Sequence, residues 1–500
     1  MPTPVLPTLT LATSLPRGPV VLVVGLGAEG VRSVPAAVDQ AYAARFGSDV
    51  AALATSVGAT AKAGHTRTLP GVDDVRVVVV GLGTDGVDAP ALRDAAASGV
   101  RQAGGLAEDG ATVDVVVALG ATTAEEALAV SAGALLGTYA YAGVTAKETP
   151  AKIGTIAVLH DGDARTAAGE DVARVASVLA TAVATAREWV NVPANLLYPE
   201  SFADEVETLA KGTKLKVEVL DETELAAQGY GGLMAVGGGS ARPPRLVRLT
   251  YRPRGATAHL ALVGKGITFD TGGLNLKPAD GMYTMKCDMA GAAAVLAATW
   301  AIAELGLPVQ VTAYGALAEN MPSGSAYRPS DVLTIYGGTT VENANSDAEG
   351  RLVMADALAR SNADSPDLVV DVATLTGAAI VALGDRTAGV MATDDPTARR
   401  VLDAADRAGE PFWQLPIPPE TRGKLDSTVA DLRSSGTDRA GGALAAAAFL
   451  REFVDAGTPW AHLDIAGPAF RTGSAEGAFS AGGTGVGVVT LVELARTLAG

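Results

Sequence analysis

The stretch Val263-Gly-Lys-Gly-Ile-Thr-Phe-Asp-Thr-Gly-Gly-Leu-Asn-Leu-Lys-Pro278 carries the strongest structural signal in this chain. It begins inside an apolar run, residues 259–265, that predicts a β-strand, and it continues into a glycine-rich loop. Lys265, Asp270 and Lys277 place charges where the apolar run gives way to that loop. Because binding sites in α/β proteins form beyond the carboxyl ends of strands, the stretch predicts both an α/β fold and a site.

Short β-branched runs and Ala-rich segments alternate on both sides of this stretch, which is typical of a sheet layered with helices. We expect strands over residues 20–24, 75–80, 112–118, 153–160, 215–220, 246–251, 309–316 and 368–373. We expect helices over residues 36–46, 89–102, 124–139, 168–191, 290–305, 355–363 and 442–453. The pattern predicts an α/β chain with two domains, each a mixed or mostly parallel sheet layered with helices.

The long helix over residues 168–191 ends before Pro193 and is expected to join the two domains, because the residue before a proline resists the helical conformation. We therefore expect an N-terminal α/β domain over residues 1–165, a linking helix over 166–194 and a larger C-terminal domain over 195–500.

Composition narrows the class of protein. Of the 500 residues, 48% are apolar, and 38 Lys and Arg face 55 Asp and Glu, a net charge of −17. A surface this acidic repels phosphate backbones and anionic lipids, which disfavours a general nucleic-acid or membrane-surface binder. Residues 1–24 contain one basic residue, Arg17, and no apolar run reaches the roughly 18–20 residues of a membrane span. We expect a cytoplasmic protein with no membrane partner.

Two glycine patterns and one cysteine offer other chemistry. Gly25-Leu-Gly27-Ala-Glu-Gly30 and Gly81-Leu-Gly83-Thr-Asp-Gly86 each follow a strand-like run, as a dinucleotide-binding fingerprint would. The acidic residue expected about 20 positions later is not clearly placed for either pattern, so simple strand-to-loop turns are favoured. Cys287 has no recognisable histidine base nearby in the sequence, and we interpret it as a small buried residue.

A second charged segment, Asn345-Ser-Asp-Ala-Glu-Gly-Arg-Leu352, places Asp347, Glu349 and Arg351 two residues apart. In an extended conformation the three side chains would share one face, where the carboxylates repel each other unless a cation lies between them. With Asp270 and Asp288 they give four carboxylates, enough for two divalent ions. Oxygen ligands without histidine suit Mn²⁺ or Mg²⁺ and tolerate Zn²⁺.

Residues 263–278, 285–290 and 345–352 together resemble the signature segments of the leucyl aminopeptidases, the hexameric dimetal cytosol aminopeptidase family. Supporting matches are Asn191-Val-Pro-Ala-Asn195, Gly237-Gly-Gly-Ser-Ala-Arg-Pro-Pro244 and Ala373-Thr-Leu-Thr-Gly377. Ser346 stands where the family usually has threonine. The resemblance covers residues 170–490, and residues 1–165 match in general layout alone, as is typical of that family's variable N-terminal domain.

The resemblance implies two metal ions, Mn²⁺ or Zn²⁺, bound by five residues. One ion would be held by Asp270, Asp347 and Glu349, and the other by Lys265, Asp270, Asp288 and Glu349. A lysine amine ligates only when neutral, and an adjacent divalent cation favours that form. The metal pair would bind the free amine of a peptide, polarise the scissile carbonyl and activate a water.

The resemblance also implies roles for residues outside the metal ligands. Lys277 would stay charged and stabilise the developing oxyanion, and Arg351 would hold a bicarbonate that acts as general base. Met285 would line the pocket for the first side chain, with a broad preference for leucine and other apolar residues. Thr374, Leu375 and Gly377 would steer the substrate, a peptide with a free N-terminus, and the protein would form a homohexamer.

Two other classes of function stay open at this point. Some members of the family also bind DNA in a regulatory role, which the net charge of −17 disfavours here. A nucleotide-dependent oxidoreductase would have to use the Gly25–Gly30 turn.

Overall fold

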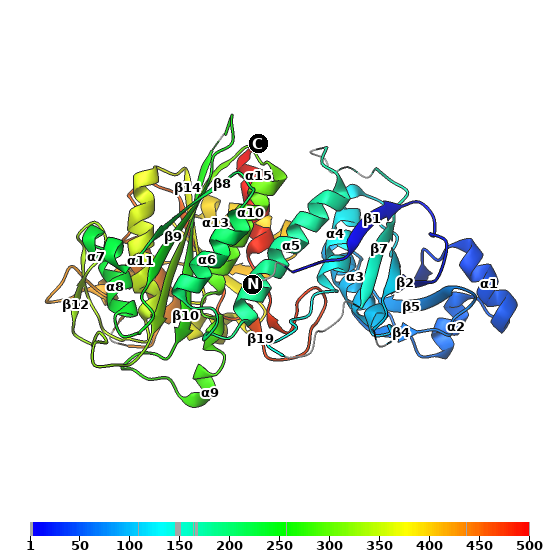
Figure 1. Ribbon diagram of the computed structural model, residues 1–500, viewed down its shortest axis with the longest axis horizontal. Helices are drawn as coiled ribbons and strands as arrows, with labels where there is room; N and C mark the ends of the chain where they lie inside the picture. Colours follow the sequence, from blue (N-terminus) through cyan, green and yellow to red (C-terminus); the bar gives the residue numbers. More distant parts are fainter. Residues whose placement is uncertain are drawn as a thin grey trace. The chain divides into compact units, whose positions relative to one another are not determined.

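The computed structural model describes residues 4–108, 110–145, 152–163, 165, 169–256, 258–436 and 438–499. The chain divides into two compact units (Figure 1). The larger unit contains Thr185–Arg471 and Gly482–Gly500, and the smaller unit contains Pro4–Ala184 and Thr472–Ala481. Helix α5 (Val172–Asn191) contains the point where one unit passes into the other.

The smaller unit is built on a seven-stranded sheet with the order β1-β7-β6-β2-β5-β4, and β3 pairs with β2. The five neighbouring strands β1, β7, β6, β2 and β5 run parallel to one another. In contrast, β4 pairs with β5 and β3 pairs with β2 in the antiparallel direction. The strand bounds are β1 (Thr8–Ala12), β2 (Val20–Gly27), β3 (Gly30–Arg32), β4 (Thr66–Thr68), β5 (Val75–Gly81), β6 (Val113–Ala118) and β7 (Ile153–Leu159).

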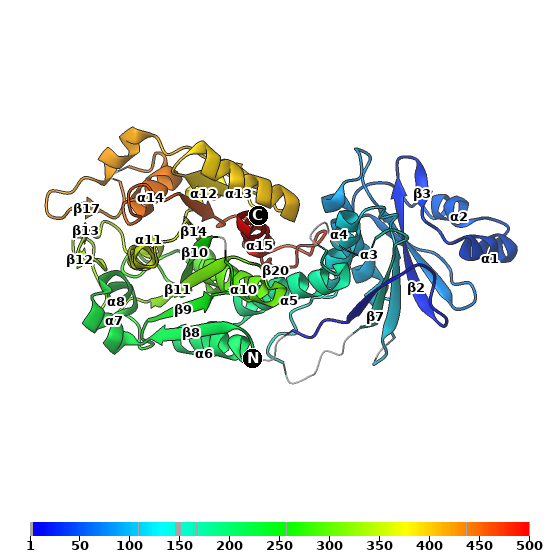
Figure 2. The same cartoon turned by 90° about the horizontal axis from the view of Figure 1, so that it is seen from above.

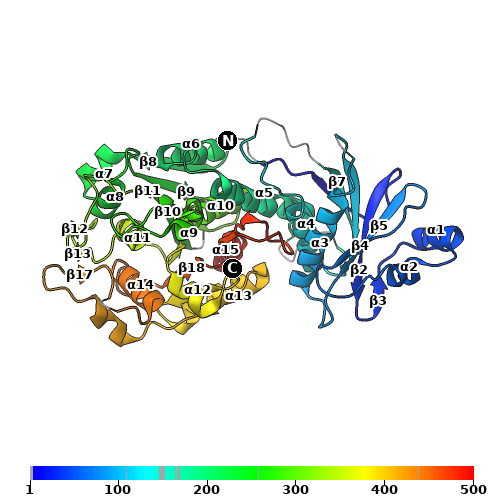
Figure 3. The ribbon, with the colours of Figure 1, turned by 90° about the horizontal axis from the view of Figure 1, so that it is seen from below.

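Four helices cover the two faces of this sheet: α1 (Ala36–Phe46), α2 (Val50–Ser56), α3 (Ala89–Gly104) and α4 (Ala124–Leu136). Leu22 and Val24 belong to an apolar cluster that also includes buried side chains of α1 and α2. Val23 points the other way, toward α3, where a Cβ on Gly99 would lie 2.3 Å from its Cγ1. The alternation along β2 therefore places α1 and α2 on one side of the strands and α3 and α4 on the other (Figure 3).

Neither glycine pattern forms a dinucleotide fingerprint. Gly25 and Gly27 end β2, and Gly30 begins β3, so the first pattern is an antiparallel hairpin rather than a strand leading into a helix. The second pattern begins at Gly81, the last residue of β5, and ends before α3, where Asp88 caps the helix by accepting a hydrogen bond from the Ala91 amide. A carboxylate at that helix start would repel a phosphate, which supports the interpretation of the second pattern as a turn.

The larger unit is built on an eight-stranded sheet with the order β16-β15-β18-β14-β10-β11-β9-β8. The four central strands β18, β14, β10 and β11 are parallel, and β15, β9 and β8 add antiparallel pairings outside them. The strand bounds are β8 (Leu215–Leu220), β9 (Arg245–Tyr251), β10 (His259–Asp270), β11 (Gln310–Asn320), β14 (Leu368–Ala373), β15 (Ala388–Ala392), β16 (Phe412–Gln414) and β18 (Trp460–Asp464).

Strand β10 is buried on both faces and separates two helices, α10 (Ala290–Leu305) and α11 (Glu349–Ser361). Gly264 faces α10, because a Cβ there would lie 2.5 Å from the Ala292 Cα. The next residue, Lys265, faces the opposite way and touches Gly350 of α11. Figure 2 shows these two helices on the two sides of the central strands.

The other helices and strands of this unit surround that centre. The helices are α6 (Pro199–Ala210), α7 (Glu222–Gln228), α8 (Gly231–Gly237), α9 (Ala279–Met282), α12 (Gly377–Leu383), α13 (Asp395–Ala408), α14 (Gly442–Arg451) and α15 (Val488–Ala499). Short 3-10 helices are η1 (Met285–Cys287), η2 (Asn362–Asp364) and η3 (Pro419–Leu425). The short strands are β12 (Val332–Thr334), β13 (Thr340–Glu342), β17 (Leu432–Arg433), β19 (Phe470–Arg471) and β20 (Gly482–Gly483).

One helical stretch of the described chain, Ala279–Leu305, is long and apolar enough to span a membrane by length and hydropathy. However, 89% of its apolar window is buried inside the larger unit, as expected of a core helix.

The α/β class is confirmed, with mixed sheets layered by helices. Helices α1 and α10 and strands β8 and β14 have the expected bounds. Strand β10 runs on to Asp270, five residues past its expected end at Lys265. The start of the expected helix over 168–191 includes residue 168, which lies outside the described residues; α5 begins at Val172.

Candidate metal centre

The polar side chains of the larger unit gather where its four parallel strands end. Asp270 ends β10, Asn320 ends β11 and Asp464 ends β18, while Thr374 directly follows β14. These four strands are consecutive neighbours in the sheet. The side chains therefore meet at one edge, which is the usual position of a site in an open α/β sheet.

The segment before α11 brings two further carboxylates to this edge. Asp347 lies in the turn before the helix and Glu349 is its first residue. Residues 345–352 are therefore not in the extended conformation in which the three side chains would share one face. Successive helical residues turn by about 100°, so Arg351 does not share one face with Asp347 and Glu349. The two carboxylates nevertheless meet, because the turn and not a strand directs Asp347 toward the site.

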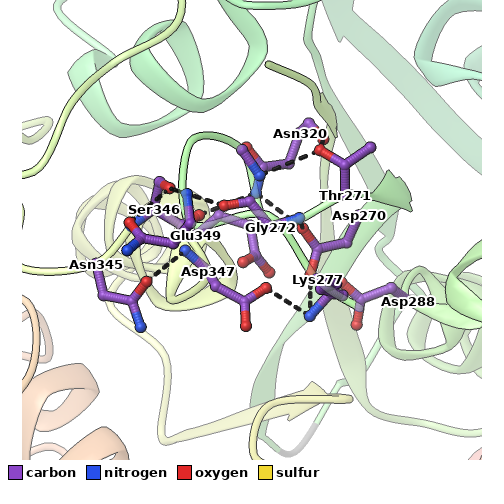
Figure 4. A network of polar contacts seen from close by, with 12 residues as sticks. Asp270, Thr271, Gly272, Lys277, Asp288, Asn320, Asn345, Ser346, Asp347 and Glu349 are labelled. Carbon is purple, nitrogen blue, oxygen red and sulfur yellow. Dashed lines mark hydrogen bonds and ion pairs between the residues drawn. The ribbon is translucent and has the colours of Figure 1, made fainter. Parts of the chain in front are cut away.

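Asp270, Asp347 and Glu349 form a compact oxygen cluster (Figure 4). One carboxylate oxygen from each lies within 4.8 Å of the others. The ammonium of Lys277 joins two of them, at 2.8 Å from Asp270 Oδ2 and 2.5 Å from Asp347 Oδ1. The Asp347 and Lys277 side chains keep 33% and 18% of their surface exposed, so solvent reaches the cluster from their side.

Lys265 joins Glu349 to the fourth predicted carboxylate. Its Nζ lies 2.8 Å from Asp288 Oδ2 and 2.8 Å from Glu349 Oε1. It also donates to the Thr374 carbonyl at 3.0 Å, and the Thr374 hydroxyl donates to Asp288 Oδ1 at 2.7 Å. Lys265, Asp288 and Glu349 are almost completely buried, so their charges interact in a medium of low polarity.

The local electrostatics follow from this crowding. Burial and repulsion by Glu349 raise the pKa of Asp270 to about 6, although Lys277 opposes the change. Burial alone would lower the pKa of Lys265, but the carboxylates of Asp288 and Glu349 outweigh it and raise that pKa. Burial also opposes ionisation of Glu349, yet Lys265 holds its pKa below the usual value. The carboxylates therefore need positive charge among them to remain ionised.

A lattice of hydrogen bonds fixes the Asp270 loop against the Asp347 turn. The Ser346 hydroxyl donates to the Gly272 carbonyl at 2.7 Å, and the Ser346 amide donates to Asn275 Oδ1 at 2.9 Å. Gly272 and Gly273 have φ of +84° and +63°, and a Cβ on Gly272 would lie 2.9 Å from Asp347 Oδ1. Side chains at these positions would be strained and would crowd the carboxylate.

Asp464 holds the loop that follows β14. Its Oδ2 accepts a hydrogen bond from the Thr376 hydroxyl at 2.7 Å, and its Oδ1 accepts one from the Leu375 amide at 3.2 Å. Thr374 of the same loop contacts both Lys265 and Asp288. Asp464 therefore supports the Lys265 side of the site through this loop.

Arg351 is 8% exposed and donates from Nη1 to the Ser434 carbonyl at 2.8 Å. Its Nε is buried without a hydrogen-bond partner among the described residues. Burial lowers the pKa of Arg351 to about 10, so the guanidinium remains charged near neutral pH. An available N–H on a buried guanidinium favours an anion at that position.

The remaining predicted residues lie around this centre. Met285 begins η1, three residues before Asp288, and its side chain is half-buried. Leu375 packs partly against the main apolar cluster, and Gly377 is exposed at the start of α12. Cys287 is buried, and burial raises the pKa of its thiol to about 12, so the thiol stays protonated and is a poor nucleophile.

The residues present fit divalent cations. Carboxylate oxygens cluster within 4.8 Å, and Glu349 Oε2 is buried with no hydrogen-bond partner in the described chain. A buried carboxylate oxygen without a partner is unfavourable unless a cation binds it. Oxygen donors of this kind suit hard divalent ions.

A carboxylate cluster with two lysines at the strand ends of an α/β sheet is typical of a metal-dependent enzyme, and comparison with known proteins identifies the class. The catalytic-domain pattern of the cytosol aminopeptidase family matches residues 184–492, and its N-terminal-domain pattern matches residues 20–148. The chain belongs to the cytosol aminopeptidase family and is a metal-dependent aminopeptidase.

Relatives of known name agree with this assignment. A probable cytosol aminopeptidase of Cutibacterium acnes is 54% identical over 91% of this chain and 88% of the relative. One of Streptomyces griseus is 47% identical over 96% of each chain.

Solved structures show the same fold. The bottromycin maturation enzyme BotP in complex with Mn has a TM-score of 0.84 and 40% identity, covering 97% of this chain and 100% of that one. A tomato leucine aminopeptidase mutant has a TM-score of 0.86 and 29% identity, covering 98% and 96%. Together with the carboxylate cluster, the Mn complex of BotP supports the use of a divalent metal by this chain.

Proposed function

We propose that this aminopeptidase binds two divalent ions, Mn²⁺ or Zn²⁺, at the strand ends of its larger unit. Asp270, Asp347 and Glu349 would hold one ion, and Lys265, Asp270, Asp288 and Glu349 the other. The observation that carries the proposal is the buried oxygen cluster of Asp270, Asp347 and Glu349, in which Glu349 Oε2 has no hydrogen-bond partner among the described residues. When bound, the metal pair would supply Lewis acidity toward the scissile carbonyl and a nucleophilic water near neutral pH.

Lys265 would act as a ligand through its neutral amine. Its present partners, Asp288 and Glu349, are also proposed ligands, and the 2.8 Å distance from the amine to each supports this role. Because these carboxylates raise the pKa of Lys265, it must release a proton when it ligates. Metal affinity should therefore fall as the pH falls.

Lys277 would hold negative charge that develops on the substrate. It lies on the more exposed side of the cluster, and the nearby carboxylates raise its pKa against the effect of burial. It therefore stays an ammonium near neutral pH. A fixed ammonium beside the reacting carbonyl would stabilise an oxyanion in the transition state.

Arg351 would hold a bicarbonate that acts as general base. The buried Nε without a hydrogen-bond partner supports an anion beside this guanidinium. A planar guanidinium matches the fork of a carboxylate-like anion. The described residues offer no histidine at the carboxylate cluster, where Asp, Glu and Lys provide the titratable groups.

The substrate would be a peptide with a free N-terminus, trimmed one residue at a time. Met285 would line the pocket for its first side chain, with a preference for leucine and other apolar residues. Thr374, Leu375 and Gly377 would steer its backbone. The Leu375 amide already donates to Asp464, so we do not assign the steering to this amide.

We further propose that residues 1–165 form a non-catalytic domain, residues 166–194 a linking helix and residues 195–500 the catalytic domain. The chain would act as a homohexamer in the cytoplasm. Sedimentation of the purified chain tests the hexamer, which a stable monomer would contradict.

The decisive experiment is release of p-nitroaniline from leucine p-nitroanilide. The chain is stripped of metal and then supplied separately with Mn²⁺, Zn²⁺, Co²⁺ or Mg²⁺, with the N-acetylated substrate as control. We expect cleavage of the free-amine substrate alone, restored by metal. Failure of every metal to restore cleavage would contradict the proposed site.

A further inference from the structure

We propose that Asn320 is a positioning residue that reserves one oxygen of Asp270 for the metal pair and ties the two ligand segments together. Asn320 is completely buried at the end of β11. Its Nδ2 donates to Asp270 Oδ1 at 2.8 Å and to the Ser346 carbonyl at 2.9 Å. One amide thus contacts the Asp270 side chain and the peptide directly before Asp347 (Figure 4).

The orientation of this amide follows from its partners. A carboxylate oxygen and a peptide carbonyl both accept hydrogen bonds, so the NH₂ end must face them. The oxygen end would repel both groups. Asn320 Oδ1 instead points toward Gly273, where a Cβ would lie 2.9 Å from it, and it has no hydrogen-bond partner within the described chain. The bare Gly273 therefore leaves room for the amide.

The consequence for Asp270 is that its two oxygens have different surroundings. Oδ1 accepts from Asn320 Nδ2 and from the Gly272 amide, both at 2.8 Å. Oδ2 lies 2.8 Å from the charged Nζ of Lys277. The protein donors thus hold Oδ1, and Oδ2 is the oxygen turned toward cations. With Oδ1 held by these donors, the Asp270 carboxylate cannot rotate freely, and Oδ2 is the oxygen that it would offer to the metal pair.

The contact to Ser346 adds a second constraint. Tyr327 also donates to the Ser346 carbonyl, at 2.7 Å, so two buried donors fix the peptide before Asp347. Asn320 is the one that also contacts Asp270. Loss of its amide would therefore leave the distance between the Asp270 and Asp347 carboxylates less well fixed, in addition to the position of each one.

This inference rests on the proposed metal site, and its test measures metal binding rather than activity. Asn320→Leu keeps the branched shape of the side chain and removes both donors. Asn362→Leu is the matched control, because Asn362 joins two segments by donating to the Phe453 carbonyl and accepting from the Asp455 amide, away from the carboxylates. Calorimetry with MnCl₂ gives the affinity and number of ions, and electron paramagnetic resonance tells a spin-coupled pair from isolated ions.

We expect the unaltered chain and Asn362→Leu to bind a spin-coupled Mn²⁺ pair. Asn320→Leu should bind Mn²⁺ about 10–100-fold more weakly, the usual effect of removing an outer partner of a ligand, with a spectrum of isolated ions. Wild-type affinity and coupling in Asn320→Leu would overturn the inference. If Asn320→Leu does not fold, Asn320→Ser is subject to the same criteria. Failure of the unaltered chain to bind Mn²⁺ would instead overturn the proposed metal site itself.

Discussion

The Lys265 side chain lies against the bare Cα of Gly350: a Cβ on Gly350 would lie 2.5 Å from Lys265 Cε and 2.7 Å from its Nζ. The colliding atoms are the end of a flexible side chain, so Gly350→Ala should displace the amine rather than unfold the chain. Because alanine in a helix is favoured over glycine by up to about 1 kcal/mol, we expect little loss of stability. Mn²⁺ affinity should fall by about 10-fold or more, measured by calorimetry.

The control for this variant is Gly423→Ala, because nothing lies within 4 Å of a Cβ built there. It should leave Mn²⁺ affinity unchanged. Unchanged affinity in Gly350→Ala as well would show that the position of the Lys265 amine does not matter for binding.

Glu349→Gln tests the carboxylate that the two proposed ligand sets share. The substitution keeps the shape of the side chain but removes the charge that pairs with Lys265 at 2.8 Å. We expect Mn²⁺ affinity and turnover to fall by more than the roughly 10–100-fold typical of an outer-sphere change. Turnover at the wild-type rate in the metal-loaded variant would refute the assignment of Glu349 as a ligand.

Arg351→Ala tests the anion proposed as general base. The variant loses the buried guanidinium but no metal ligand, so its Mn²⁺ affinity should change less than that of Glu349→Gln. Turnover should fall by about 10²–10⁴-fold, the usual contribution of a positioned base, and added bicarbonate should not restore it fully. Arg328→Ala is the control, because Arg328 is a surface residue paired with Asp331. A bicarbonate response equal to that of wild type would argue against the role of Arg351.

The buried carboxylate of Asp356, which is not one of the proposed metal ligands, should make the stability of the fold depend on pH. Its Oδ2 accepts from the Leu233 amide and its Oδ1 from the Tyr336 amide, and burial raises its pKa from 3.8 to about 7. Between these values the folded chain holds a proton that the unfolded chain has lost. The contribution of Asp356 to stability therefore falls as the pH rises from about 4 to about 7, by up to a few kcal/mol.

Urea unfolding of wild type and Asp356→Asn at pH 5 and pH 8 measures this effect. The stability advantage of the wild-type chain over the variant should be larger at pH 5. Asp394→Asn is the control, since Asp394 caps α13 and its bond to Thr397 lowers its pKa. The stability from that cap is lost only below about pH 4, so its effect should be equal at pH 5 and pH 8. An equal effect for Asp356→Asn would contradict the prediction.

Much of the fold could be predicted because local patterns coincide with it. Helix α10 is a continuous apolar run that ends at Gly306, whose φ of +72° stops the helix. Strand β14 has the bounds expected from its apolar run. In contrast, β18 escaped prediction because its five residues include His462 and Asp464, which interrupt the apolar pattern. Helix α13 was also missed, although Asp394 and Gly409 are recognisable start and stop residues.

The carboxylates and lysines of the site could be singled out because each charge lies in an apolar or glycine-rich segment. The way in which these side chains are arranged around one another could not be predicted from the sequence. The alternation of Asp347, Glu349 and Arg351 would place three side chains on one face of an extended segment, whereas the chain forms a turn and then a helix at Glu349. Asn320 gave no signal, since a single amide at a strand end has no motif. Its importance comes from pairing with residues 50 and 26 positions away.

The order in which the four strands are synthesised has a consequence for the enzyme during translation. Four strands, β10, β11, β14 and β18, bring the polar residues to the same edge of the sheet: Asp270, Asn320, Thr374 and Asp464. The ribosome synthesises these strands in that order, so β18 is the last. Parallel strands need long connections, so this edge is built from contacts between segments that are distant in the sequence. Until β18 emerges, the loop that bears Thr374 lacks its support from Asp464. We therefore expect a chain still bound to the ribosome to lack a complete site until translation has passed Asp464, the last residue of β18.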